Sequence, residues 1–180
     1  MTADGDAGNG RMLNEEEQRV RSYLVSQGEQ RDWVDLWPRF IAERGALLRA
    51  TERVSSAQAD FKSDAESWSI REIVGHVLSV SRGGLRRIED LAADRELTTV
   101  AGNRIPEKFA MLRRHLTEHS VRYASLIERL PPTPNYTQTA PHGNFGELNC
   151  RSWFVFERVH DTDHLNQIEA VKAADGYPAE

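Results

Sequence analysis

The sequence is 180 residues long and carries a net charge of −5, with 39% hydrophobic and 28% charged residues. A chain of this length fits one compact domain, and its composition is typical of soluble globular proteins. The acidic balance argues against a nucleic-acid partner, because binding a phosphate backbone requires a broad cationic surface.

The sequence shows neither a membrane-spanning segment nor a targeting signal. No run approaches the roughly 18 apolar residues of a transmembrane helix, and the N-terminus lacks the basic start and apolar run of a signal peptide. We therefore expect a cytoplasmic protein that contacts no membrane. The single cysteine, Cys150, excludes an intrachain disulfide and a cysteine-rich zinc site. A bound metal would need nitrogen and oxygen ligands.

The chain begins with a segment that has no hydrophobic period. Residues 1–11 are rich in Gly, Asp and Ala, which predicts a flexible tail, and residues 12–180 are expected to form a single domain. A short helix is predicted from Asn14 to Gln27, with Asn14 as its cap and Gly28 after its end. We expect this helix to pack outside the main bundle.

The first long helix is predicted from about Asp32 or Pro38 to Val54, because large apolar residues recur there at helical spacing. Pro38 either lies near the beginning of this helix or separates two helical pieces. Both alternatives stay open at this point.

The second long helix has a clear beginning at Ile70. Ser69 and Glu72 form a predicted capping box, in which each side chain accepts a hydrogen bond from the other residue's backbone amide. The apolar stripe continues to Leu91. The glycine pair at 83–84 weakens the helix and permits either a close helix contact or a bend.

Two further helices complete the predicted fold. Pro106 suits the first turn of the third, whose stripe runs until the proline pair at 131–132, and the fourth extends from about Cys150 to Ala174. No convincing alternating strand pattern is present. The sequence therefore predicts an all-α fold, a four-helix bundle with a short extra N-terminal helix.

The last helix carries the motif HDTDH, with His160 and His164 four residues apart. This spacing places both imidazoles on nearly the same face, one turn apart. Apolar residues share that face, so both rings should point into the bundle. His76 lies near the inward side of the second helix and supplies a third imidazole.

Three nitrogen ligands with an open coordination position are the usual arrangement of catalytic zinc, and imidazole also suits nickel or iron. We therefore predict a divalent metal site at His76, His160 and His164. The alternative is a set of hydrogen-bonded core histidines.

The remaining histidines provide a comparison within the same chain. His115 and His119 have the same spacing, but His115 lies beside charged residues and only His119 borders an apolar stripe. A solvated pair is the favoured interpretation. His142 lies in the loop before the last helix, either as an exposed residue or over the site entrance.

Three acidic residues and the cysteine are further candidates for a role at the site. Asp161 and Asp163 flank the metal pair but point away from it, which favours an orienting or solvated role. Glu72 lies four residues before His76 and is a candidate general base, although its capping role already explains it. Cys150 is a possible nucleophile, but a small buried residue at a helix start is the better interpretation.

Two segments together resemble the DinB-like metal-binding bundles, a family that includes bacterial thiol-dependent transferases. The first, WSIREIVGHVLSV at 68–80, is similar to the family's Trp-Ser start and single-histidine helix. The second, PHGNFGELNCRSWFVFERVHDTDHLNQI at 141–168, is similar to its glycine-containing loop, aromatic helix and closing histidine pair. The segment from about 1 to 30 lies outside the resemblance.

The resemblance implies a four-helix bundle that holds zinc, nickel or another divalent ion at His76, His160 and His164, often as a homodimer. Gln167 would occupy the family's glutamine position near the site. It also implies transfer or isomerisation reactions with low-molecular-weight thiols such as bacillithiol or mycothiol.

Three hypotheses about function follow. The first is transfer of a thiol to an electrophilic small molecule, with the metal lowering the pKa of the thiol. The second is metal-dependent hydrolysis of an amide or ester, with Glu72 or a loop residue moving the proton. The third is a metal-stabilised stress-response module without turnover.

Overall fold

The computed structural model describes residues 12–98, 106 and 108–179, and the predicted flexible tail at 1–11 lies outside these ranges. The described chain is mostly helical. Its helices are α1 (Glu15–Gln30), α2 (Trp33–Ala50), α3 (Ser56–Asp60), α4 (Ile70–Ala92), α5 (Phe109–Ala124), α6 (Leu126–Arg129) and α7 (Cys150–Ala173). The strands β1 (Thr139–His142) and β2 (Gly146–Asn149) form an antiparallel hairpin.

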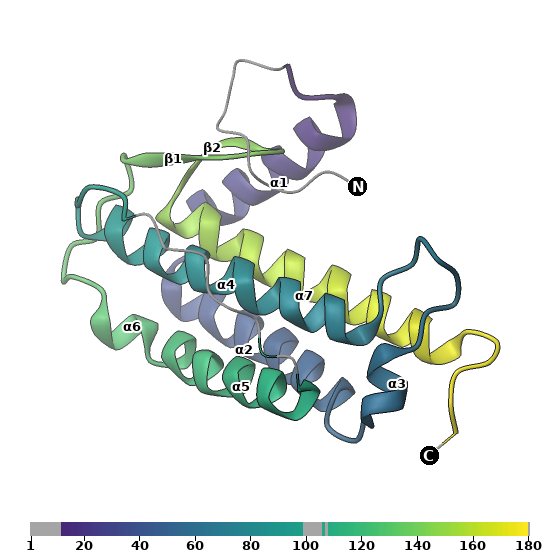
Figure 1. The fold of residues 1–180 in the computed structure, drawn as a ribbon. Helices are drawn as coiled ribbons and strands as arrows, with labels where there is room; N and C mark the ends of the chain where they lie inside the picture. Colours follow the sequence, from purple (N-terminus) through teal and green to yellow (C-terminus); the bar gives the residue numbers. More distant parts are fainter. Residues whose placement is uncertain (1–11, 99–105, 107, 180) are drawn as a thin grey trace.

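The long helices α2, α4, α5 and α7 pack together, and α7 contacts both α2 and α4 along its length (Figure 1). Their apolar stripes fill two buried clusters, one around Phe40 and Phe154 and the other around Leu47, Ile73 and Leu112. Fully burying each such side chain contributes about 1.5–3 kcal/mol. The prediction of a helical bundle is confirmed.

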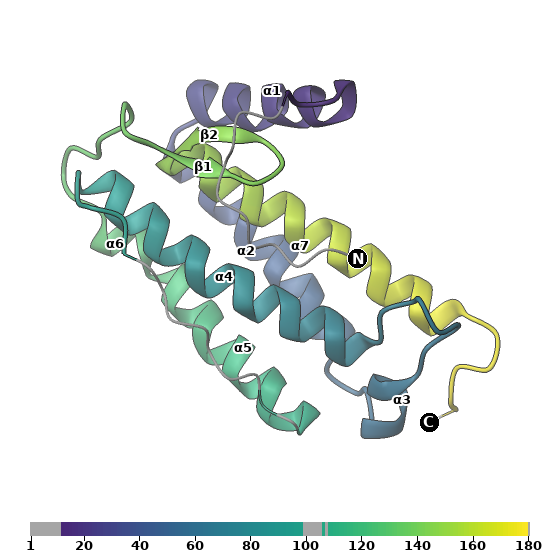
Figure 2. The ribbon, with the colours of Figure 1, turned by 45° about the horizontal axis from the view of Figure 1, so that its top comes forward.

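The N-terminal helix α1 lies across one end of the bundle, beside the hairpin (Figure 2). Asn14 and Glu17 form its capping box, as the cap prediction required. The predicted end before Gly28 is wrong, because Gly28 is buried inside the helix. A Cβ at that position would lie 2.8 Å from Oγ of Ser152, so the glycine permits close packing against α7.

Helix α2 begins at Trp33 with Asp32 as its N-cap residue, so the earlier of the two predicted starts is confirmed, and Pro38 lies inside the helix without dividing it. The amide that Pro38 lacks would have bonded to the carbonyl of Val34, and Val34 is 74% exposed, so water can serve that carbonyl. The helix ends at Ala50 instead of Val54. The buried Thr51 hydroxyl donates to the Leu48 carbonyl at 2.9 Å and takes the place of the next helical turn.

The beginning of α4 at Ile70 is confirmed, including the reciprocal capping by Ser69 and Glu72. Gly84 provides the close contact that the glycine pair permitted. A Cβ on Gly84 would lie 1.8 Å from Oε1 of Glu157 on α7. The glycine therefore makes room for a buried carboxyl group between α4 and α7.

The third predicted helix differs at both ends. It begins at Phe109 instead of Pro106, because Lys108 has an extended backbone (φ −82°, ψ 124°). It is interrupted at Ser125, where the hydroxyl donates to the Arg122 carbonyl at 3.2 Å and competes with the helical pattern. The short α6 follows before the proline pair.

The sequence did not predict the hairpin of β1 and β2. Its strands are four residues each and β1 contains Pro141, so no alternating pattern is long enough to recognise. The hairpin packs against α4 and the start of α7. Within the described ranges, no helix is long and apolar enough to cross a membrane.

Candidate metal centre

Three imidazoles from two helices converge between α4 and α7. Nε2 of His160 lies 3.1 Å from Nε2 of His76 and 3.0 Å from Nε2 of His164. Ligand atoms of the three residues all lie within 4.8 Å of one another. A tetrahedral ion with bonds of about 2.0–2.1 Å would separate its ligand nitrogens by about 3.3 Å. The three nitrogens therefore have the spacing of a divalent metal site.

The local sequence explains this convergence. His160 and His164 lie one turn apart on α7, and the capping box at Ser69 starts the helix that carries His76. Trp68, just before that cap, packs against two of the rings. Its ring centroid lies 5.0 Å from that of His76, and it stacks on His164 at 6.2 Å with nearly parallel planes.

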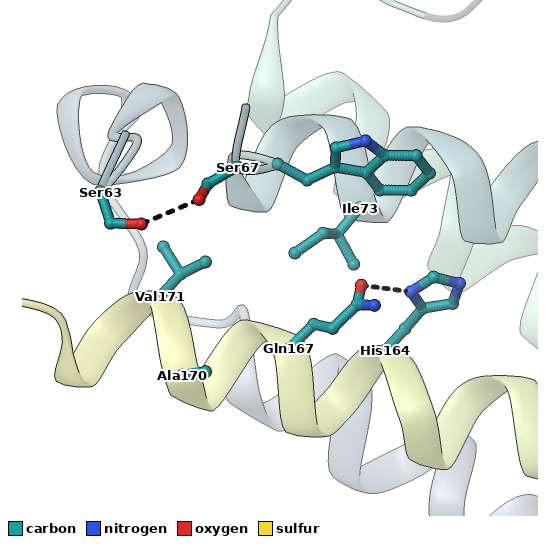
Figure 3. A pocket seen from close by; sticks show the side chains of 8 residues that line it. Ser63, Ser67, Ile73, His164, Gln167, Ala170 and Val171 are labelled. Carbon is teal, nitrogen blue, oxygen red and sulfur yellow. Dashed lines mark hydrogen bonds between the residues drawn. The ribbon is translucent and has the colours of Figure 1, made fainter. Parts of the chain in front are cut away.

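A hydrogen bond fixes the protonation of one candidate ligand. Nδ1 of His164 lies 2.9 Å from Oε1 of Gln167 (Figure 3). An amide oxygen only accepts hydrogen bonds, so Nδ1 carries the proton and Nε2 keeps its lone pair. Gln167 thus orients His164 from outside the cluster, as supporting residues of metal sites do.

Burial also favours the neutral form of His160 and His164. Burial, together with the neighbouring His164 and His76, lowers the pKa of His160 to about 2. Burial also lowers the pKa of His164. Metal ions bind the neutral form of imidazole. Neutral imidazole is a ligand that suits zinc, nickel and iron, so this donor set fits a divalent ion.

A cavity of about 410 Å³ adjoins the cluster. Its walls are mostly apolar, with two hydroxyl groups and an amide among them: Ser63, Ser67, Trp68, Ile73, His164, Gln167, Ala170 and Val171. Figure 3 shows His164 and Gln167 on α7 along one wall, while Ser63 and Ser67 share a 3.1 Å hydrogen bond farther along. A small molecule in this cavity would reach His164 directly.

The candidate general base, Glu72, is occupied elsewhere. One of its carboxylate oxygens accepts from Nζ of Lys62 at 2.8 Å, and the other accepts from the backbone amide of Ser69 at 2.8 Å. The Lys62 contact lowers the pKa of Glu72. These contacts give Glu72 a capping role, and its catalytic role stays a prediction.

Asp161 turns away from the histidines, as predicted, toward a residue that the sequence analysis missed. Arg44 of α2 is 2% exposed and binds both Asp161 carboxylate oxygens at 2.6 and 2.9 Å. Glu157, also buried, lies 3.9 Å from the same guanidinium. The sequence did contain one sign of this role, because Arg44 is a charged residue within the apolar stripe of α2.

His115, His119 and Cys150 do not belong to the cluster of three histidines. Among the described residues, His115 and His119 belong to no group with metal-ligand spacing. His115 is half-buried and lies 3.5 Å from Nη2 of Arg82, while His119 is buried. The Cys150 thiol is buried and donates to the Asn135 carbonyl, and burial raises its pKa to about 11. A nucleophilic thiolate at Cys150 is therefore not supported.

His142 is not a simple exposed loop residue. It belongs to β1, and its ring centroid lies 4.3 Å from that of Phe156, which in turn lies 5.4 Å from His160. The hairpin therefore places His142 against the aromatic wall behind the histidine cluster.

Comparison with known proteins agrees with this geometry. The sequence model of the DinB superfamily matches residues 39–168, a region that includes all three histidines and leaves out the N-terminal segment. YuaE, an uncharacterized protein of Bacillus subtilis (strain 168), is 22% identical over 147 residues, which cover 66% of this chain and 86% of that protein. No solved structure matches the chain. Because the family match spans well over half of the sequence, the chain belongs to the DinB superfamily.

Proposed function

We propose that the chain is a metal-dependent enzyme that transfers a low-molecular-weight thiol to an electrophilic small molecule. The observation that carries this proposal is the position of the three Nε2 atoms beside a largely apolar cavity. Zinc is the preferred ion, with nickel or iron as alternatives. Such an ion supplies Lewis-acid chemistry that lowers the pKa of a thiol or water ligand.

The residues around the site have separate tasks in this proposal. His76, His160 and His164 would hold the ion, and Gln167 keeps the His164 lone pair directed toward it. Trp68 and Ile73 offer an apolar surface on which an electrophile can lie, and Ser67 offers a hydroxyl. The thiol sulfur would form the new bond to carbon, the leaving group would depart with its electron pair, and the thiol proton would pass to water.

Hydrolysis is the second candidate and is less well supported. It needs a group that moves a proton at the site, and Glu72 is held by Lys62 and Ser69 instead. Thiol transfer needs no such base once the sulfur is ionised. The position of Glu72 therefore favours the thiol.

The experiment measures turnover of an electrophilic reporter by zinc-loaded protein with and without a panel of low-molecular-weight thiols. We expect turnover that requires a thiol, that is lost in His164→Ala and that survives in His115→Ala. Hydrolysis of esters or amides without thiol would favour the second candidate. Absence of any turnover across the panel would contradict an enzymatic role and favour a binding module.

A pair of variants tests whether the cavity holds the substrate. Ala170 lines the cavity and is exposed, so Ala170→Trp fills it without disturbing the core. Asn166→Trp places the same side chain at an exposed position of α7 outside the cavity lining. We expect a raised KM only in Ala170→Trp. An equal KM in both variants would place the substrate elsewhere.

A further inference from the structure

A second cavity, of about 490 Å³, lies between α4 and α5, which run side by side in Figures 1 and 2. It shares no described lining residue with the cavity beside His164. Its lining is basic. Arg82 and Arg86 come from α4, and His119 and Arg122 come from α5.

The acidic groups nearby are already paired. Glu89, which also lines the cavity, accepts from Arg129 at 2.8 Å. Asp90 is shared by Arg86 at 3.2 Å and Arg95 at 3.0 Å. These ion pairs leave little negative charge to balance the remaining arginines.

Two of the arginines that line the cavity, Arg82 and Arg122, have no carboxylate partner among the described residues. Arg82 instead lies 3.5 Å from Nδ1 of His115. An uncompensated pair of arginines around a cavity is notable in a chain whose net charge is −5.

His119 adds an unused polar group to this lining. Its ring is 6% exposed, and its Nε2 atom has no hydrogen-bond partner among the described residues. Burial, together with the positive charges of Arg44, Arg122 and Arg82, lowers the pKa of His119 to about 4. The positive potential of the cavity arginines therefore reaches the buried ring.

We propose that this cavity is a binding site for a small molecule that carries a phosphate group. Guanidinium forks match the oxygens of a phosphate, and hydrogen bonds between two charged groups are about twice as strong as neutral ones. The volume is within the usual range of about 300–1,000 Å³ for small-molecule sites, and part of the lining is an apolar surface for the rest of the ligand. A nucleic acid would need a broad cationic face instead of one cavity.

The test is a calorimetric titration of the full chain with inorganic phosphate, at fixed ionic strength with chloride as the balancing ion. A phosphate monoester such as glycerol phosphate is titrated in parallel. We expect saturable binding at about one site per chain, and tighter binding of the monoester if the apolar surface contributes. Tighter binding of free phosphate would identify the inorganic ion as the ligand and overturn the small-molecule assignment.

Variants locate the binding. Arg122→Gln and Arg82→Gln should each weaken phosphate binding by about tenfold or more. Arg113→Gln removes one positive charge from α5 outside the cavity lining and should bind like the wild type. His160→Ala should also bind normally, which separates this site from the histidine cluster. Equal weakening in Arg113→Gln, or no saturable binding by the wild type, would overturn the proposal.

Discussion

Arg44 is the residue whose replacement tests the description of the bundle interior most sharply. The substitution Arg44→Met keeps an unbranched side chain and removes the guanidinium that binds Asp161 at 2.6 and 2.9 Å. Asp161 and Glu157 are both 0% exposed, so neither can turn to water in the folded chain. The variant therefore leaves two buried carboxyl groups without their cation.

The expected loss of stability is large. Breaking a buried ion pair by removing one partner costs about 3–5 kcal/mol. Arg44 also donates to Ser81 at 3.0 Å, and the loss of this hydrogen bond is included in the roughly 3–5 kcal/mol. A domain of this kind has a total stability of about 5–15 kcal/mol. Arg44→Met should therefore remove a substantial part of the free energy of unfolding.

Urea denaturation at pH 7, followed by circular dichroism, measures this loss. Arg39→Met is the matched control, because Arg39 lies on the same helix and is exposed, and it should change stability by less than about 0.5 kcal/mol. If Arg44→Met costs no more than Arg39→Met, the buried charge network does not stabilise the bundle as described.

Three other predictions concern residues near this network and the metal cluster. Gly84→Ala should destabilise the fold by about 1–3 kcal/mol in urea, because its Cβ would lie 1.8 Å from Oε1 of Glu157; an unchanged midpoint would contradict this contact. Burial raises the pKa of Glu157 from 4.5 to about 7, so its contribution to stability is full below about pH 4.5 and is lost as the pH rises through 7. Glu157→Gln should therefore lose less stability than the wild type between pH 5 and 8, and an identical pH profile would refute this. Gln167→Ala should weaken zinc binding about 10- to 100-fold in a competition titration, because His164 loses its orienting hydrogen bond; an unchanged affinity would exclude that role.

The sequence was most informative where a local rule decides the structure. The capping box at Ser69 predicted the start of α4 to the residue, and HDTDH placed two imidazoles on one face of α7. Both depend on hydrogen bonds or spacing within a few residues. The position of His76 near the inward side of its helix predicted the third ligand, and the resemblance to the DinB family implied the same site.

The sequence-based predictions fail where contacts between residues that are distant in the sequence determine the structure. Gly28 looks like a helix end, but the close approach of Ser152 explains it. Arg44 interrupts an apolar stripe because it binds Asp161, which is 117 residues away in the sequence. The cavity beside His164 is formed partly by Ser63 and Ser67, which precede α4 in a segment without periodicity. Such contacts follow from packing and not from local pattern.

The central claim is that His76, His160 and His164 bind one divalent ion. Metal analysis of protein purified without an affinity tag tests it most directly, with His160→Ala as the site variant and His115→Ala as the control for the second histidine pair. We predict about one ion per chain in the wild type and in His115→Ala, and none in His160→Ala. Wild-type protein that stays metal-free after equilibration with zinc, or His160→Ala that retains its ion, would contradict the claim.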